Sequence, residues 1–139
     1  MTDPDLIAKK LAFIEACVTE LRKHSRPELI EKDVKEERFI AHTLQIAIQA
    51  ALDVASHIVS DERLEEPRTN RELFDLLAQD GWINPDQRQI LQNMVGFRNI
   101  VVHGYEKVDL KILRDIVENH LEDLLNFSHA IRSRINKQQ

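Results

Sequence analysis

Nine residues in the second half of the chain read Phe97-Arg98-Asn99-Ile100-Val101-Val102-His103-Gly104-Tyr105. The residues from Gln92 to Val102 are largely apolar or helix-compatible, so they predict a helix that ends within this stretch. Gly104 suits a left-handed residue that terminates a helix. His103 is therefore expected in the last helical turn, where the negative end of the helix dipole favours an imidazolium.

Arg98 and His103 are the candidate groups for phosphate chemistry. Arg98 is a permanent cation whose forked donors match phosphate oxygens, and an imidazole can accept and release a proton near neutral pH. Five residues span about 140° around a regular helix, so the two side chains do not share a face. They converge only if the helix breaks after Val102 or if a second subunit contributes. The plain alternative is a solvated arginine and a capping histidine.

The composition predicts a single all-α domain covering residues 1–139. Hydrophobic residues make up 42% of the chain and charged residues 31%, and only three glycines and four prolines are present, too few for a turn-rich β fold. The net charge of −5 argues against extensive non-specific nucleic-acid binding but allows a local basic cleft. No signal segment opens the chain and no apolar run of about 18 residues occurs, so we expect a cytoplasmic protein without a membrane span.

Capping residues and apolar spacing predict four to five helices in an antiparallel bundle. The first helix is expected over 4–22 after the N-cap Asp3, and the second, which is the longest, over 28–60. Thr69 caps a short helix that Gly81 ends, with Trp82 either plugging the bundle end or stacking on a base. Asn84 caps the helix that runs into residues 97–105.

Asp109 caps the last expected helix, which continues to Ile135. His120 falls on its apolar face, where a core histidine with a satisfied ring is expected.

The second expected helix is apolar on most faces between residues 40 and 59, so it is central to the bundle or lies at a subunit contact. Asp53, His57 and Asp61 recur every four residues along it. This stripe is either a metal-ligand face or a set of buried or interfacial polar residues, and Asp53 could also pair with an arginine near the site. We predict no metal and no cofactor.

Several other chemistries lack their residues in this chain. It has no glycine-rich phosphate loop, no Cys/His set with zinc spacing and no Gly-x-Ser-x-Gly elbow. Histidine and arginine together can cleave RNA without a metal, because the ribose 2′-hydroxyl attacks the adjacent phosphate while arginine stabilises the growing charge. One histidine does not easily act as both the base and the acid, because these lie on opposite sides of the phosphorus. A homodimer that brings two Arg98/His103 pairs into one cleft is one solution.

The Arg98-x4-His103-x-Tyr105 pattern, in a small helical chain with a long second helix, resembles the signature of HEPN domains. More narrowly, it resembles the HepT-like toxins of the DUF86 group. The resemblance implies a homodimeric ribonuclease toxin in which Arg98 and His103 are catalytic. We expect Asn99 and Gly104, with Asp53 on the long helix, to support the site.

The resemblance also implies a protein partner and a modification. HepT-like toxins pair with a nucleotidyltransferase antitoxin of the MntA type, which transfers AMP to the signature tyrosine, here Tyr105. Phosphate groups two residues from His103 would put negative charge and bulk where the RNA phosphate must sit. A larger hetero-oligomer with the antitoxin is consistent with this. The structural alternative for Tyr105 is a rim residue that packs over the loop.

Two other functions remain open on the residues alone. The chain could be a non-catalytic HEPN module that docks a nucleotidyltransferase, which the acidic balance suits, although such an adaptor does not need Arg98 and His103. It could also be a helical dimer whose motif arose by chance, which predicts no RNA cleavage and no effect on growth.

Overall fold

Five of the helices start at a polar residue whose side chain accepts a backbone N–H of the first turn, namely Asp3, Asp33, Thr69, Asn84 and Asp109. The computed structural model describes residues 3–138. Its helices are α1 (Pro4–His24), α2 (Val34–Asp61), α3 (Asn70–Gln79), α4 (Pro85–His103), α5 (Leu110–Asn119) and α6 (Leu121–Gln138), with 3₁₀ turns η1 (Pro27–Leu29) and η2 (Tyr105–Lys107). No strand occurs in the described range, and the predicted all-α bundle is confirmed.

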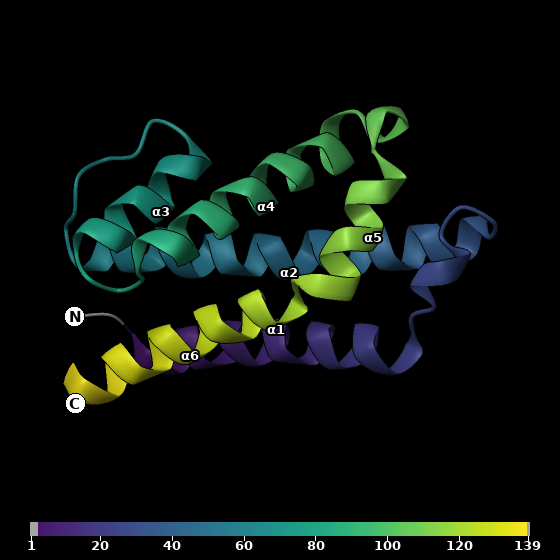
Figure 1. Ribbon diagram of the computed structural model, residues 1–139. Helices are drawn as coiled ribbons and strands as arrows, with labels where there is room; N and C mark the ends of the chain where they lie inside the picture. Colours follow the sequence, from purple (N-terminus) through teal and green to yellow (C-terminus); the bar gives the residue numbers. More distant parts are fainter. Residues whose placement is uncertain (1–2, 139) are drawn as a thin grey trace.

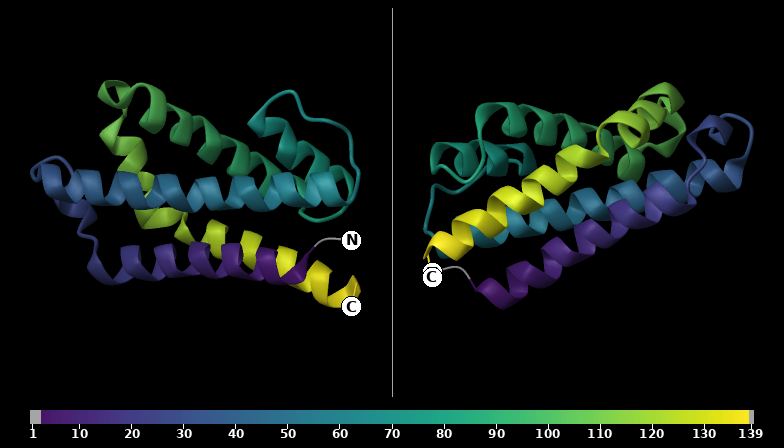
Figure 2. Two further views of the ribbon diagram at one scale, coloured as in Figure 1. Left: turned by 180° about the vertical axis from the view of Figure 1, so that it is seen from behind. Right: turned by 60° about the horizontal axis from the view of Figure 1, so that its bottom comes forward.

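The central element is α2. It contacts α1, α3, α4 and α5, while α1 also packs along α6. Figures 1 and 2 show α1 and α6 on one side of α2, α3 and α4 on the other, and α5 crossing between α4 and α6. The second half of α2 is buried on most faces because it packs against helices on both sides. Its predicted central position is confirmed.

Among the described helices, α2 is long and apolar enough to cross a membrane by composition alone. However, 61% of its most apolar window is buried inside the bundle. The apolar composition of α2 therefore matches its place in the protein core.

The second helix starts later than expected. Pro27 opens η1, and the chain then turns before Asp33, whose side chain accepts the backbone N–H of Lys35 at 2.9 Å. The charged residues before Val34 therefore form a turn instead of the first part of α2. The physical reason is that a capping aspartate stops a helix from extending backwards.

The single last helix expected from Asp109 onward is instead two helices, α5 and α6, which meet at His120. The backbone of His120 has φ −125° and ψ 8°, outside the helical region. Its ring nitrogens lie 3.3 Å from a carboxylate oxygen of Asp115 on α5 and 2.8 Å from one of Asp123 on α6, so the ring contacts both helices.

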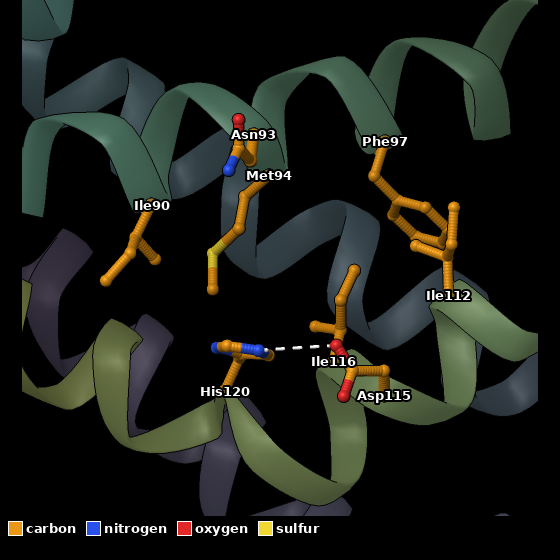
Figure 3. A pocket seen from close by; sticks show the side chains of 8 residues that line it. All are labelled: Ile90, Asn93, Met94, Phe97, Ile112, Asp115, Ile116 and His120. Carbon is orange, nitrogen blue, oxygen red and sulfur yellow. Dashed lines mark ion pairs between the residues drawn. The ribbon is translucent and has the colours of Figure 1, made fainter.

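His120 is also not the core residue that the sequence predicts. Its side chain is 38% exposed and borders a pocket of about 170 Å³ between α4 and α5. Figure 3 shows Ile90 and Met94 on the α4 side of this pocket. The apolar pattern continues past the break, which is why the spacing of residues alone does not reveal it.

The end of α3 matches its prediction. Gly81 has a φ of +83°, the left-handed conformation that glycine adopts without strain. Trp82 is buried, its indole N–H donates to Asp80 at 3.1 Å, and the Arg134 guanidinium covers its ring at 4.7 Å. Trp82 therefore plugs the bundle and is not available to stack on a base.

Candidate active site

Arg98 projects from α4 toward α2. Its Nη2 donates to the side-chain oxygen of Gln49, and its Nη1 donates to the side-chain oxygen of Asn99 at 2.9 Å. The side chain is half-buried, and its Nε has no acceptor among residues 3–138. Asn99 thus contacts the guanidinium directly, and its expected supporting role in the site stays a prediction.

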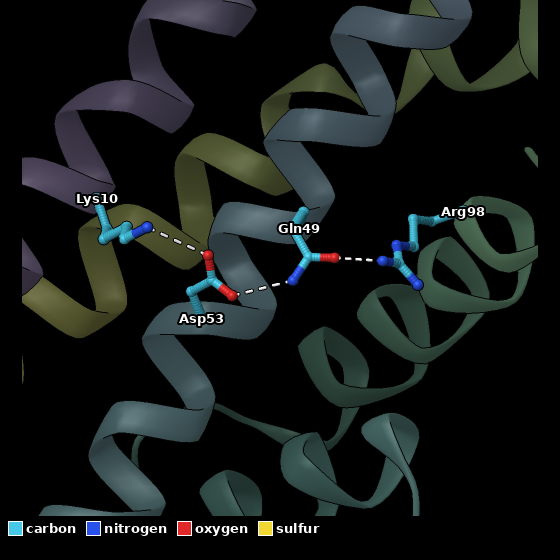
Figure 4. A network of polar contacts seen from close by, with 4 residues as sticks. All are labelled: Lys10, Gln49, Asp53 and Arg98. Carbon is cyan, nitrogen blue, oxygen red and sulfur yellow. Dashed lines mark hydrogen bonds and ion pairs between the residues drawn. The ribbon is translucent and has the colours of Figure 1, made fainter. Parts of the chain in front are cut away.

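Gln49 connects Arg98 to two further side chains (Figure 4). The Gln49 amide N–H donates to Asp53 at 2.9 Å, and Lys10 on α1 forms an ion pair with the same carboxylate at 3.2 Å. Asp53 therefore pairs with a lysine and not with an arginine, and it reaches Arg98 only through Gln49. This network joins α1, α2 and α4.

His103 is the last residue of α4 and is exposed to solvent. No hydrogen bond or ion pair within residues 3–138 engages its ring, so it is free to meet a substrate. The helix continues unbroken from Arg98 to His103, which leaves the two side chains about 140° apart around the axis and about 7.5 Å apart along it. No hydrogen bond joins the two side chains within residues 3–138.

Gly104 ends α4 but not in the predicted conformation. Its φ of −157° and ψ of 60° lie outside the left-handed region, so that prediction was wrong. The chain turns directly into η2, in which the Gly104 carbonyl accepts the N–H of Lys107 at 2.8 Å. A Cβ at Gly104 would meet no atom closer than 3.8 Å, so space within the chain does not require glycine here.

Tyr105 is held against the first turns of α2. Its hydroxyl donates to Glu37 at 2.6 Å, and the Arg38 guanidinium lies over its ring, 4.4 Å from the centroid. The Glu37 side chain is only 16% exposed. Burial, followed by the bond to Glu37, raises the pKa of Tyr105 to about 12. We did not predict the roles of Glu37 and Arg38 from the sequence.

The stripe of Asp53, His57 and Asp61 is divided between separate contacts. Asp53 faces Lys10 and Gln49, whereas His57 lies 3.1 Å from Asp61. Within the described part of the chain, no three side chains of metal-binding type are grouped as a metal site requires. The stripe therefore contributes polar contacts between and along helices.

The chain is a helical bundle in which α4 carries Arg98 and ends at His103, with Tyr105 directly after it in η2, and this arrangement matches the HEPN signature. The family model described as "Ribonuclease HepT-like" matches residues 12–131. The chain belongs to this HepT-like family.

Two relatives are nucleases. The chain is 32% identical over 130 residues to the mRNA nuclease HepT of Shewanella oneidensis, covering 93% of this chain and 98% of that protein. It is 27% identical over 109 residues to the tRNA nuclease HepT of Aphanizomenon flos-aquae, covering 77% and 74% respectively. The predicted class of enzyme, a ribonuclease, is confirmed by the family.

A solved structure also supports the fold and the biological setting. The tri-AMPylated HEPN toxin of Shewanella oneidensis, solved in complex with its MNT antitoxin, has a TM-score of 0.87 and 32% identity, covering 94% of this chain and 99% of that one. The prediction that the chain is a toxin of this class is confirmed. The roles of its individual residues stay predictions.

Proposed function

We propose that this chain cleaves RNA as a homodimer in which two copies of Arg98 and His103 line one cleft. The observation that carries the proposal is the unbroken helix between them. Arg98 bonds to Gln49 on α2 whereas His103 is exposed to solvent, and this arrangement on a regular helix favours two copies that supply the two groups to one phosphate. A twofold axis near the end of α4 would bring complementary groups together.

The proposed reaction needs only side chains of the two copies. One His103 imidazole accepts the proton of the ribose 2′-hydroxyl as that oxygen attacks the phosphorus. The bond from phosphorus to the 5′-oxygen breaks, and the second His103, as imidazolium, protonates the leaving oxygen. Arg98 donates hydrogen bonds to the non-bridging oxygens, where negative charge develops.

Replacing His103 by alanine tests this assignment. We expect RNA cleavage to fall by about 10²-fold or more, because the side chain supplies general acid–base catalysis. His129, an exposed histidine on α6, gives the matched control, since His129→Ala should cleave as the wild type does. Cleavage by a folded His103→Ala protein at the wild-type rate would contradict the proposal.

The proposed partner is a nucleotidyltransferase antitoxin that uses ATP to modify Tyr105. The AMPylated relative in complex with its MNT antitoxin supports this, as does the presence of only one tyrosine in this chain. The tyrosine oxygen attacks the α-phosphorus, pyrophosphate leaves, and the hydroxyl loses its proton. The added phosphate would lie two residues from His103 and repel the RNA backbone.

We propose that the ribonuclease activity takes place in the cytoplasm. We assign it to a single domain over residues 1–139.

A further inference from the structure

Four arginines in residues 3–138 are half-buried, and Arg98 differs from the other three in its acceptors. The others each form an ion pair with a carboxylate: Arg88 with Asp75, Arg132 with Glu15, and Arg134 with Asp80. Arg98 forms no ion pair within the described range and bonds only to two neutral amides, Gln49 and Asn99. A partly buried cation that is positioned but not neutralised keeps its charge for a ligand.

The orientation of the Gln49 amide follows from its second contact. A glutamine amide presents an oxygen at one end and an NH₂ group at the other, and an arginine can use only the oxygen. Because Asp53 can only accept, it takes the NH₂ end of Gln49 and leaves the oxygen facing Arg98. Lys10 in turn balances the charge of Asp53, so this carboxylate has a closer cation than Arg98.

We infer that Gln49 is the positioning residue for Arg98. Asp53 orients Gln49 by accepting its amide N–H, and Lys10 holds Asp53 by an ion pair. The inference rests on the proposed function of Arg98 as the phosphate-binding group. The neutral amide fixes the guanidinium in direction while leaving its positive charge for the scissile phosphate. A carboxylate at residue 49 would hold the guanidinium equally well but would compete with the phosphate for it.

Two substitutions of Gln49 separate position from charge. Gln49→Ala removes the acceptor, and we expect kcat for RNA cleavage to fall by about 10- to 100-fold because Arg98 loses its direction. Gln49→Glu keeps an acceptor but neutralises Arg98, so KM should rise as well. Gln45, one turn away on α2, gives the control: it forms no hydrogen bond with Arg98 within residues 3–138, so Gln45→Glu adds the same charge and should change cleavage by less than about threefold.

The salt dependence of RNA binding distinguishes this role from a purely structural one. Binding of a single-stranded RNA oligonucleotide is measured in the His103→Ala background, which prevents turnover. Each lost phosphate contact should reduce the slope of log affinity against log salt by about 0.7. The slope for Gln49→Glu should match the slope for Arg98→Ala. The slope for Gln49→Ala should be closer to that of the parent protein, which carries His103→Ala alone. A Gln49→Glu slope equal to the parent's would overturn the inference.

A double-mutant cycle tests the residues behind Gln49. If Asp53 acts only by orienting Gln49, then Gln49→Ala and Asp53→Ala together should reduce kcat/KM no more than Gln49→Ala alone. Additive losses would contradict the proposed order of contacts.

Should Arg98→Ala cleave RNA as well as the wild type, the proposed function itself fails. If Arg98→Ala is inactive while both Gln49 variants are fully active, only this inference fails.

Discussion

Tyr105 has an environment that raises its pKa, and this shift can be measured in solution. Its hydroxyl is bonded to a mostly buried carboxylate, and a guanidinium covers its ring. Because it is the only tyrosine in the chain, any tyrosine signal in solution reports on this one position.

Ultraviolet absorbance of tyrosinate should show Tyr105 titrating with a pKa of about 12, above the ordinary value of 10.0. A folded-state pKa raised in this way stabilises the fold below about pH 10, and the contribution disappears as pH rises through about 12. Glu37→Gln should lower the pKa, because it removes the negative charge beside the hydroxyl. A titration at the ordinary value in the wild type would show that the Glu37 contact does not form in solution.

Tyr105→Phe tests the proposed control by modification. Phenylalanine keeps the ring under Arg38 but cannot accept AMP, so the variant should cleave RNA near the wild-type rate. We expect it to resist inhibition by the nucleotidyltransferase antitoxin and ATP, measured as residual cleavage after preincubation. Equal inhibition of the variant and the wild type would show that Tyr105 is not the controlling site.

At this scale the sequence predicts the residues that lie close together along the chain. Arg98, His103 and Tyr105 follow from the resemblance of their pattern to the HEPN signature, and the position of His103 in the last turn of α4 is confirmed. Gln49 and Glu37 could not be predicted, because they lie 49 and 68 residues away from the groups they bind. Their contacts depend on how α2 is rotated against α4 and η2.

Among the elements, α6 is anchored to α1 by one carboxylate. Glu15 accepts the hydroxyl of the fully buried Ser128 at 2.5 Å and binds Arg132 at 3.0 Å. Burial opposes the charged form of Glu15, but the bonds from Arg132 and Ser128 outweigh it and hold its pKa below the ordinary value. This contribution to stability is present at neutral pH and is lost as the pH falls through the folded-state pKa.

Glu15→Ala should lower the free energy of unfolding by about 1–3 kcal/mol, because it leaves the buried Ser128 hydroxyl without its acceptor. Chemical denaturation with urea measures this change. Glu20→Ala, at an exposed position on α1, should change the free energy by less than about 0.5 kcal/mol. A Glu15→Ala protein as stable as the Glu20→Ala control would show that water replaces the lost acceptor.

Helix starts were predictable where a capping residue is followed by proline or by a Glu or Gln three residues later, as at Asp3, Thr69 and Asn84. The breaks at Asp33 and His120 were not, because the apolar and charged pattern of a helix continues across each of them. Each break is decided by contacts: a side-chain cap at Asp33 and two carboxylates around the His120 ring.

For the whole molecule, the proposed shared cleft predicts complementation between two inactive variants. Arg98→Ala supplies two His103 side chains per dimer, and His103→Ala supplies two Arg98 side chains. After subunit exchange, a mixed dimer would contain one Arg98 and one His103 in the shared cleft. It should cleave faster than either parent but well below the wild-type rate, because the second His103 is missing. Mass measurement of the exchanged dimers provides the control. Mixed dimers that form but cleave no faster than either parent would contradict the shared cleft.

The straightness of α4 has a consequence for how such a toxin behaves while it is being made. In the proposed dimer, a newly synthesised copy is only half an enzyme, since its own arginine and histidine point in different directions. Lethality then depends on chains meeting, so at low expression it rises with the square of their abundance. The straight helix α4 would thereby make toxicity depend on a minimum concentration of the toxin, even without an inhibitor.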